Sequence, residues 1–171
     1  MIYEPGEDSF LLVSFIIKYA KNSVLDMGCG SGILALEAMK YTNNVLAADI
    51  NSKAVEYCKN QGINAVKSNL FSNIKGRFGL ILFNPPYLPK DRRENKKDAA
   101  ALAGGRKGHE IIERFLKDAK KHIEEDGKIL IVVSSLTGDA EKLFKKHGYK
   151  FKKLAEESYF FEKLKVYMLC C

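Results

Sequence analysis

The sequence lacks any long hydrophobic run. Its longest apolar stretch, residues 10–17, is interrupted by Ser14 and is much shorter than the about 18 residues that a membrane span requires. This stretch follows the acidic residues Glu7 and Asp8, whereas a secretory signal begins with basic residues. We therefore expect no membrane partner and a cytoplasmic location, with the nucleus as a further compartment.

Paired cysteines are missing as well. Cys29, Cys58, Cys170 and Cys171 form no CxxC pair, and no histidine lies at ligand spacing from them. Structural zinc sites and disulfide frameworks depend on such spacing. We therefore predict neither a metal site nor a disulfide framework, and we interpret the two C-terminal cysteines as free thiols.

The chain has 171 residues without an internal repeat or a long linker, and its formal net charge is +7. This length suits one α/β domain that covers residues 1–171. The positive charge favours an acidic partner surface or RNA, but a lysine-rich solvated surface explains it equally well. In residues 90–98 every residue except Asn95 is charged. Such a segment indicates a surface loop that is either simply solvated or in contact with substrate.

Strand-like and helix-like apolar patterns alternate along the chain. The segments with a helical pattern are residues 7–20, 32–40, 52–60, 108–125 and 138–146. Asp8 or Ser9 is expected to cap the first helix, and Asn51 or Ser52 to start the third. The segments with a strand pattern are residues 23–27, 45–50, 63–67, 78–83, 128–133, 149–155 and 163–169. This alternation predicts an α/β fold with a doubly wound, mostly parallel sheet.

A glycine-rich turn follows the first predicted strand, in the order Gly28-Cys29-Gly30-Ser31-Gly32. Glycines let the chain turn tightly and bring backbone N–H groups close to a ligand. A dinucleotide-binding GxGxxG pattern would need glycine at position 33, which is Ile33 here. The order GxGxG instead suits S-adenosylmethionine, because Asp26, two residues upstream, can accept from the cofactor's ammonium group. Simple strand–helix packing is the alternative explanation for such a turn.

Two further polar residues follow the next predicted strands. Asp49 ends the second strand, where a ribose-binding acid belongs in this class of fold. The alternative is an N-cap for the following helix, although Asn51 and Ser52 already offer one. Asn69 follows the third strand, where a contact to the adenine ring is expected.

The sequence Asn84-Pro85-Pro86-Tyr87 comes directly after the apolar strand 78–83. The carboxyl ends of parallel strands are where such sheets bind ligands. The Asn84 side-chain oxygen and the Pro85 carbonyl are two acceptors that can hold the N–H groups of a planar nitrogen and stabilise positive charge as it develops. Tyr87 adds a flat apolar face. These residues predict methyl transfer to an amide or exocyclic nitrogen; a plain turn is the alternative.

These motifs resemble the HemK-type glutamine methyltransferases and the amino-methyltransferases of nucleic acid bases. Residues 3–12 and 101–115 make the chain similar to the eukaryotic and archaeal branch of the former. That branch methylates the glutamine of the Gly-Gly-Gln loop in class-one translation termination factors. The resemblance implies S-adenosylmethionine as cofactor and a seven-stranded sheet whose last strand is antiparallel.

The resemblance also implies site residues. Those expected to bind the cofactor are Tyr3, Pro5, Ser9, Asp26, Gly28, Gly30, Asp49, Ile50, Asn69, Leu70 and Asn84. Those expected to bind the substrate are Asn84, Pro85, Pro86 and Tyr87, with Asn84, Pro85 and Tyr87 acting in catalysis. The family often has aspartate where this chain has Asn69, so we expect somewhat weaker cofactor binding but not loss of function.

Other functions remain open at this point. Adenine N6-methylation of DNA or RNA uses the same four-residue motif, but the chain offers no target-recognition domain or base-flipping apparatus. Lysine methylation of proteins is a further alternative. A scaffold subunit that binds cofactor without catalysis is a fourth, although such a subunit has no physical need for an intact Asn84–Tyr87 motif.

The resemblance finally implies a partner, a small zinc-binding activator subunit. The strand predicted over residues 63–67 should lie at a sheet edge, where its backbone N–H and C=O groups are unpaired. Lys67 is the only charged residue in this strand that could oppose pairing with another chain. The neighbouring apolar strand could leave an uncovered patch. We therefore predict a heterodimer in which the partner adds a strand here; an edge protected by the chain's own loops is the alternative.

Overall fold

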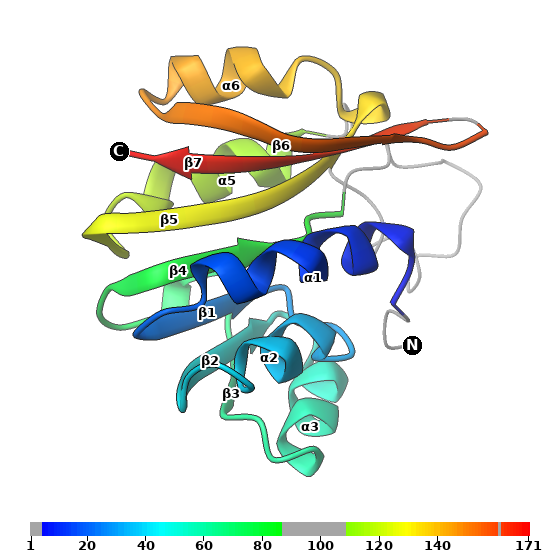
Figure 1. Cartoon of the computed structure of the whole chain (residues 1–171). Coiled ribbons are helices and arrows are strands. Elements are labelled where there is room, and N and C mark those ends of the chain that lie inside the picture. Colours follow the sequence, from blue (N-terminus) through cyan, green and yellow to red (C-terminus); the bar gives the residue numbers. More distant parts are fainter. Residues whose placement is uncertain (1–4, 87–108, 161) are drawn as a thin grey trace.

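The computed structural model describes residues 5–86, 109–160 and 162–171. Its centre is a seven-stranded sheet with the order β3-β2-β1-β4-β5-β7-β6 (Figure 1). The strands are β1 (Ser23–Met27), β2 (Asn44–Asp49), β3 (Ala65–Lys67), β4 (Phe78–Phe83), β5 (Ile123–Ser134), β6 (Lys150–Ser158) and β7 (Lys163–Cys170). Only the pairs that include β7 are antiparallel. The predicted mostly parallel sheet with an antiparallel last strand is confirmed.

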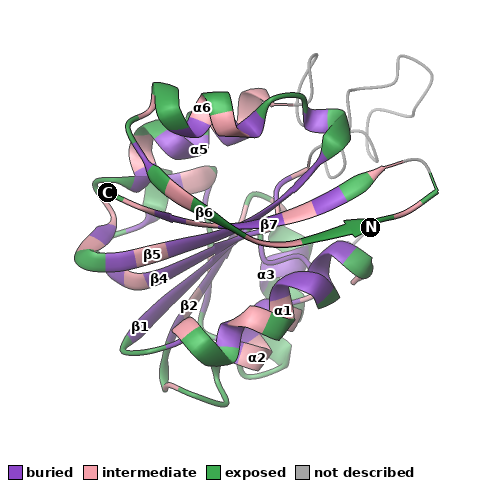
Figure 2. Cartoon of the chain, turned by 45° about the horizontal axis from the view of Figure 1, so that its top comes forward, coloured by how far each residue is buried: buried purple, intermediate pink, exposed green. Residues whose placement is uncertain are grey.

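Helices cover both faces of the sheet (Figures 1 and 2). One face carries α1 (Glu7–Tyr19), α2 (Ile33–Ala38) and α3 (Ser52–Asn60), and the other carries α5 (Glu110–Ala119) and α6 (Ala140–Lys146). Successive side chains of a strand point to opposite faces, so Val24 of β1 packs with α1 and α2 while Leu25 packs with α5. Burial on both faces explains why the central strands are nearly continuous apolar runs.

Two helix predictions were wrong at their ends. Gly6, not Asp8 or Ser9, is the N-cap of α1, because the side chains of Asp8 and Ser9 are buried and hydrogen-bonded to each other. The helix predicted over residues 108–125 ends at Ala119, and β5 already begins at Ile123. The helical sequence pattern continues past Ile123 to Glu125, but Ile123 pairs with Phe78 of β4 in the sheet. Strand pairing with β4 therefore prevails over the local helical pattern.

The edge position of β3 is confirmed, although the strand is shorter than predicted and begins at Ala65. The expected uncovered patch is present only in part. Val45, Ala47 and Ala48 of β2 are buried, whereas Leu46 and its neighbour Val66 of β3 are half-buried. None of the helices in the described parts of the chain has the length and apolar character that crossing a bilayer requires.

Candidate active site

Three parallel strands end at the same level of the sheet. In the register, Met27 of β1 lies beside Ala48 of β2 and beside Phe83 of β4. The residues that follow each strand therefore meet at one edge, which is where open α/β sheets bind ligands. This edge brings together most of the residues that the sequence predicted for the site.

The glycine-rich turn folds over the end of β2. The backbone N–H groups of Gly28 and Cys29 both donate to the carbonyl of Ala48, at 2.7 and 3.0 Å. The N–H of Gly30 donates to Oδ2 of Asp49 at 3.0 Å. The turn is thus hydrogen-bonded to β2 at three successive backbone donors and does not depend on a ligand for its shape.

Gly32 closes this turn and is the N-cap of α2. Its φ of +81° is in the left-handed region, and a Cβ atom here would lie 2.6 Å from Cδ1 of Ile63 and 3.0 Å from Sγ of Cys58. Any larger residue would have a strained backbone here and would also force the side chains of Ile63 and Cys58 to shift. Glycine is required here by backbone conformation and by close packing together.

Asp26 is fully buried near the end of β1. Its Oδ2 accepts from the N–H of Ala35 in the first turn of α2 at 3.1 Å, and thereby supplies the side-chain cap that Gly32 cannot. Its Oδ1 is buried without a hydrogen-bond partner among the described residues. Burial raises the pKa of Asp26 to about 7, the bond from Ala35 opposes this shift, and the nearby charge of Asp49 adds to it.

Asp49 binds backbone on two sides. Besides Gly30, it accepts from the N–H of Asn51 through Oδ1 at 2.8 Å, while Asn51 itself is the N-cap of α3 and accepts from Lys53. A carboxylate has about four acceptor sites, so Asp49 retains capacity for a ligand's hydroxyl groups. Ile50, the next residue, is 59% exposed and offers an apolar face beside that carboxylate.

Asn84 follows β4 and contacts α1. Its Nδ2 donates to Oγ of Ser9 at 3.1 Å, and its Oδ1 is a second buried acceptor without a partner among the described residues. Buried polar groups are nearly always paired, and an unpaired one calls for an explanation. Pro85 is buried and Pro86 half-buried. Pro5 precedes Gly6 on the segment that carries Ser9.

The end of β3 contributes two further predicted residues. Asn69 is exposed, and its Oδ1 accepts from Arg114 of α5 at 3.2 Å. Leu70 has a left-handed φ of 50°, which costs about 1–2 kcal/mol in a residue with a side chain. The buried hydroxyl of Ser68 holds this conformation by donating to the Leu70 carbonyl and accepting from the N–H of Asn73. Strained residues of this kind often lie at binding sites.

Sequence analysis missed Ser68 and Arg114. A hydroxyl residue just before a turn is a local signal that could have indicated Ser68. Arg114 lies 45 residues from Asn69, and no local pattern predicts that contact. Tyr3, Tyr87 and the charged residues 90–98 lie outside the described residues.

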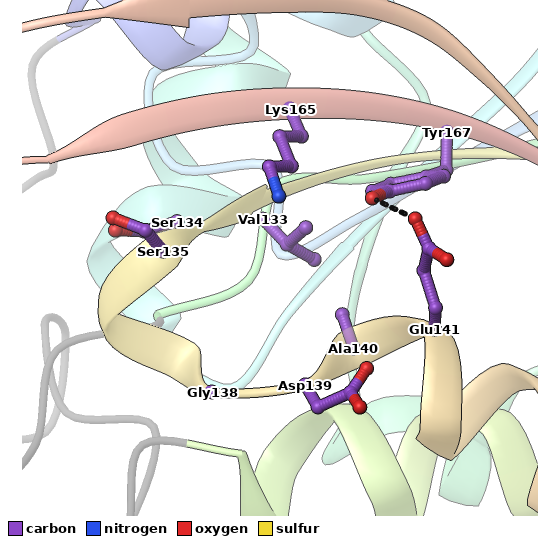
Figure 3. Close-up of a pocket in the computed structure, with 9 residues that line it drawn as sticks. All are labelled: Val133, Ser134, Ser135, Gly138, Asp139, Ala140, Glu141, Lys165 and Tyr167. Carbon is purple, nitrogen blue, oxygen red and sulfur yellow. Dashed lines mark hydrogen bonds between the residues drawn. The ribbon is translucent and has the colours of Figure 1, made fainter.

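A separate cavity of about 240 Å³ lies at the end of β5, between the following turn, α6 and β7 (Figure 3). The Tyr167 hydroxyl donates to Glu141 inside it at 2.8 Å, and Lys165 and Asp139 add charges. None of the predicted site residues lines this cavity. It is therefore a separate surface at the carboxyl end of β5 and not the candidate site itself.

Comparison with known proteins agrees with this strand-end geometry. The model of the family described as the methyltransferase small domain matches residues 6–162. The chain belongs to this family. It is an S-adenosylmethionine-dependent methyltransferase, and its fold is that of the class I enzymes.

Relatives of the methyltransferase include proteins named as glutamine methyltransferases. A protein of Methanocaldococcus jannaschii, provisionally named a protein N5-glutamine methyltransferase, is 36% identical over 96% of this chain and 89% of the relative. A release factor glutamine methyltransferase of Borreliella burgdorferi is 32% identical over 63% of this chain, which spans only 43% of that relative.

A solved structure is similar along nearly the whole methyltransferase chain. It is the E. cuniculi Mtq2–Trm112 complex, which is responsible for the methylation of the eRF1 translation termination factor. The TM-score is 0.80 at 25% sequence identity, and the match covers 98% of this chain and 97% of the other.

The packing of Gly32 can be tested by comparing two glycines. Gly62 has a similar φ of +80°, but nothing lies within 4 Å of a Cβ placed there. Gly62→Ala should cost about 1 kcal/mol of unfolding free energy from backbone strain alone. Gly32→Ala should cost about 2 kcal/mol more, because its Cβ also overpacks the contact with Ile63 and Cys58. Urea denaturation measures the loss of unfolding free energy in both variants, and equal losses would show that close packing at Gly32 is unimportant.

Proposed function

We propose that this methyltransferase modifies the side-chain amide nitrogen of the glutamine in the Gly-Gly-Gln loop of a class-one translation termination factor. One observation carries the proposal. Oδ1 of Asn84 is buried without a hydrogen-bond partner among the described residues, and it lies directly after β4 and in front of two prolines. An acceptor held in this way suits the N–H donor of a planar nitrogen. The similarity to proteins that methylate glutamine or a termination factor supports the same choice.

The residues at the strand ends fit the cofactor. Oδ1 of Asp26, which has no partner in the described part of the chain, suits an ammonium group, and the remaining lone pairs of Asp49 suit the two ribose hydroxyls. Ile50 and Leu70 would flank the adenine ring, with Asn69 at its edge. When bound, S-adenosylmethionine supplies an electrophilic methyl group.

The chain's own contribution to the reaction is positioning and electrostatics. The lone pair of an amide nitrogen is delocalised, so the nitrogen is a poor nucleophile. Asn84 Oδ1 and the Pro85 carbonyl would hold its two N–H groups and stabilise the positive charge that develops on it. Holding the nitrogen in place removes most of the entropic barrier. A methylated amide cation is strongly acidic and loses its proton to water, so no strong base is required.

The proposed role of Asp26 predicts a pH dependence of cofactor affinity. Because the pKa of Asp26 is about 7 in the free protein, its carboxyl group is protonated below that pH and cannot pair with an ammonium. Affinity should therefore rise as pH increases from 5.5 to 7, by roughly tenfold per unit at most, and then level off. Asp49, Cys29 and Cys58 are the titratable groups that interact electrostatically with Asp26.

Calorimetric titration with S-adenosylmethionine at several pH values measures this dependence. Asp26→Asn is the matched control, because its amide oxygen can still accept from Ala35 but it has no proton to lose. This variant should bind more weakly at pH 7.5 and show little change with pH. A wild-type affinity that is flat from pH 5.5 to 7.5 would remove Asp26 from the cofactor site.

The substrate class is tested with a purified class-one release factor and labelled cofactor. The enzyme should label the release factor but not a release factor whose loop glutamine is replaced by asparagine, and it should not label DNA or RNA oligonucleotides. Asn84→Ala should lower kcat at least about tenfold, which is roughly 1.4 kcal/mol of barrier, with a smaller change in cofactor affinity. Strong transfer to adenine with none to the protein would overturn the proposal.

We also propose that the chain works as a heterodimer with a small zinc-binding activator subunit, bound along β3, in the cytoplasm. What supports this is the edge position of β3, the half-buried apolar side chains of Leu46 and Val66 beside it, and the similarity to a structure that is itself a two-protein complex. Asn64 and Ser68 hydrogen-bond to β2. Because the direction of the backbone groups alternates along a strand, those of Ala65 and Lys67 point away from β2. The Lys67 carbonyl already accepts from Asn73 Nδ2 at 2.9 Å, so the N–H groups of both residues and the Ala65 carbonyl would face such a partner.

A proline at the outward position tests the interface. Lys67→Pro removes an outward N–H group without removing a bond to β2, since prolines are tolerated at such edge positions. It should weaken binding of the activator at least about tenfold, the cost of roughly one hydrogen bond, while the unfolding midpoint of the lone chain stays close to that of wild type. Lys67→Ala, which keeps the N–H, is the control and should bind normally. Equal affinity of both variants would contradict pairing along β3.

A further inference from the structure

The hydrogen bonds around Asn84 form a chain that begins on another element. Asn84 Nδ2 donates to Oγ of Ser9 at 3.1 Å, across 75 residues of sequence. Ser9 in turn lies beside Oδ1 of Asp8, which accepts from the Ser9 N–H at 2.6 Å and from its hydroxyl at 3.3 Å. Ser9 and Asp8 are each only 3% exposed. Two buried polar residues of α1 are thus directed toward the reactive end of β4.

The orientation of Asn84 decides what it can do. An amide side chain keeps nearly the same shape when it turns by half a revolution, and only its hydrogen-bond partners distinguish the two orientations. With the oxygen toward the site, Asn84 accepts from an N–H of the target. With the nitrogen toward the site, two donors would face each other.

Ser9 alone cannot select between these orientations. A hydroxyl both donates and accepts, so it could bond to either end of the Asn84 amide. The carboxylate of Asp8 removes this ambiguity, because an ionised carboxylate only accepts. It takes the single hydroxyl proton of Ser9, and Ser9 then has only lone pairs to offer to Asn84. The Nδ2 group must turn toward Ser9, which leaves Oδ1 facing the site.

We propose that Asp8 and Ser9 are positioning residues that set the orientation of the Asn84 amide, so that its oxygen faces the target nitrogen. The proposal rests on the proposed function, in which Asn84 holds an N–H group. It also accounts for one feature of the fold, which is that neither Asp8 nor Ser9 caps α1 although both residue types are good caps.

Three variants of α1 test the proposal in the release-factor assay. Ser9→Ala removes the acceptor for Nδ2, and Asp8→Asn replaces an obligatory acceptor by an amide that can donate to Ser9 and so permits the opposite orientation. Both should lower kcat at saturating cofactor at least about tenfold, and this loss should exceed any change in the cofactor Kd, to which Ser9 is also expected to contribute. Ser14→Ala is the control on the same helix, because the Ser14 hydroxyl bonds only to the Leu11 carbonyl among the contacts described; its kcat should equal that of wild type.

Two further measurements separate positioning from structural damage. Ser9→Thr keeps the hydroxyl and should recover most of the kcat that Ser9→Ala loses. In an Asn84→Ala background, adding Ser9→Ala should change kcat by less than about twofold, because residues that act through one another are not additive. If Ser9→Ala does not fold, the kcat of Asp8→Asn, a nearly isosteric substitution, tests the positioning role on its own.

The outcomes distinguish this inference from the function on which it rests. If Asn84→Ala keeps wild-type activity, the proposed function fails. If Asn84→Ala is inactive but Ser9→Ala and Asp8→Asn have wild-type kcat, only the positioning role is overturned. If the two variants lose activity only because their cofactor Kd rises, while kcat at saturating cofactor is unchanged, Ser9 acts only as a cofactor ligand and the positioning role is likewise overturned.

Discussion

Two carboxylates bonded to backbone N–H groups hold the site in shape. Asp26 ties the end of β1 to the first turn of α2 through Ala35, and Asp49 ties the glycine-rich turn to the end of β2 through Gly30. The parallel register brings these strand ends to the same level, but without the two carboxylates the turn between them would have unpaired donors. The site is therefore formed before any ligand binds, and a preformed site loses less entropy on binding.

This arrangement has a cost in stability. Asp26 Oδ1 and Asn84 Oδ1 are buried without partners in the described part of the chain, and a buried acceptor without a hydrogen bond typically costs about 1–3 kcal/mol. The raised pKa of Asp26 is a direct sign of that cost. A ligand that brings an ammonium and a substrate that brings an N–H group would each remove one of these penalties. Binding energy at this site would then come partly from the relief of these desolvation penalties.

Much of the fold could be predicted from the sequence because its signals are local. β1 and β4 have the predicted bounds, and Asn51 starts α3 as expected. The assignment of Asp26 and the glycine-rich turn to the cofactor stays a prediction. Contacts between distant segments could not be predicted. The bond from Asn84 to Ser9 spans 75 residues and depends on how α1 lies on the sheet, and β5 begins inside a helical pattern because Ile123 pairs with β4.

The central claim is that a glutamine amide nitrogen receives the methyl group, and tandem mass spectrometry tests it most directly. The enzyme, together with its activator subunit if that proves necessary, is incubated with a class-one release factor and S-adenosylmethionine, and the digested product is sequenced. The account predicts one added methyl group on the side chain of the glutamine in the Gly-Gly-Gln peptide. A methyl group found only on lysine, or no modified peptide under conditions in which a nucleic acid is methylated, would contradict it.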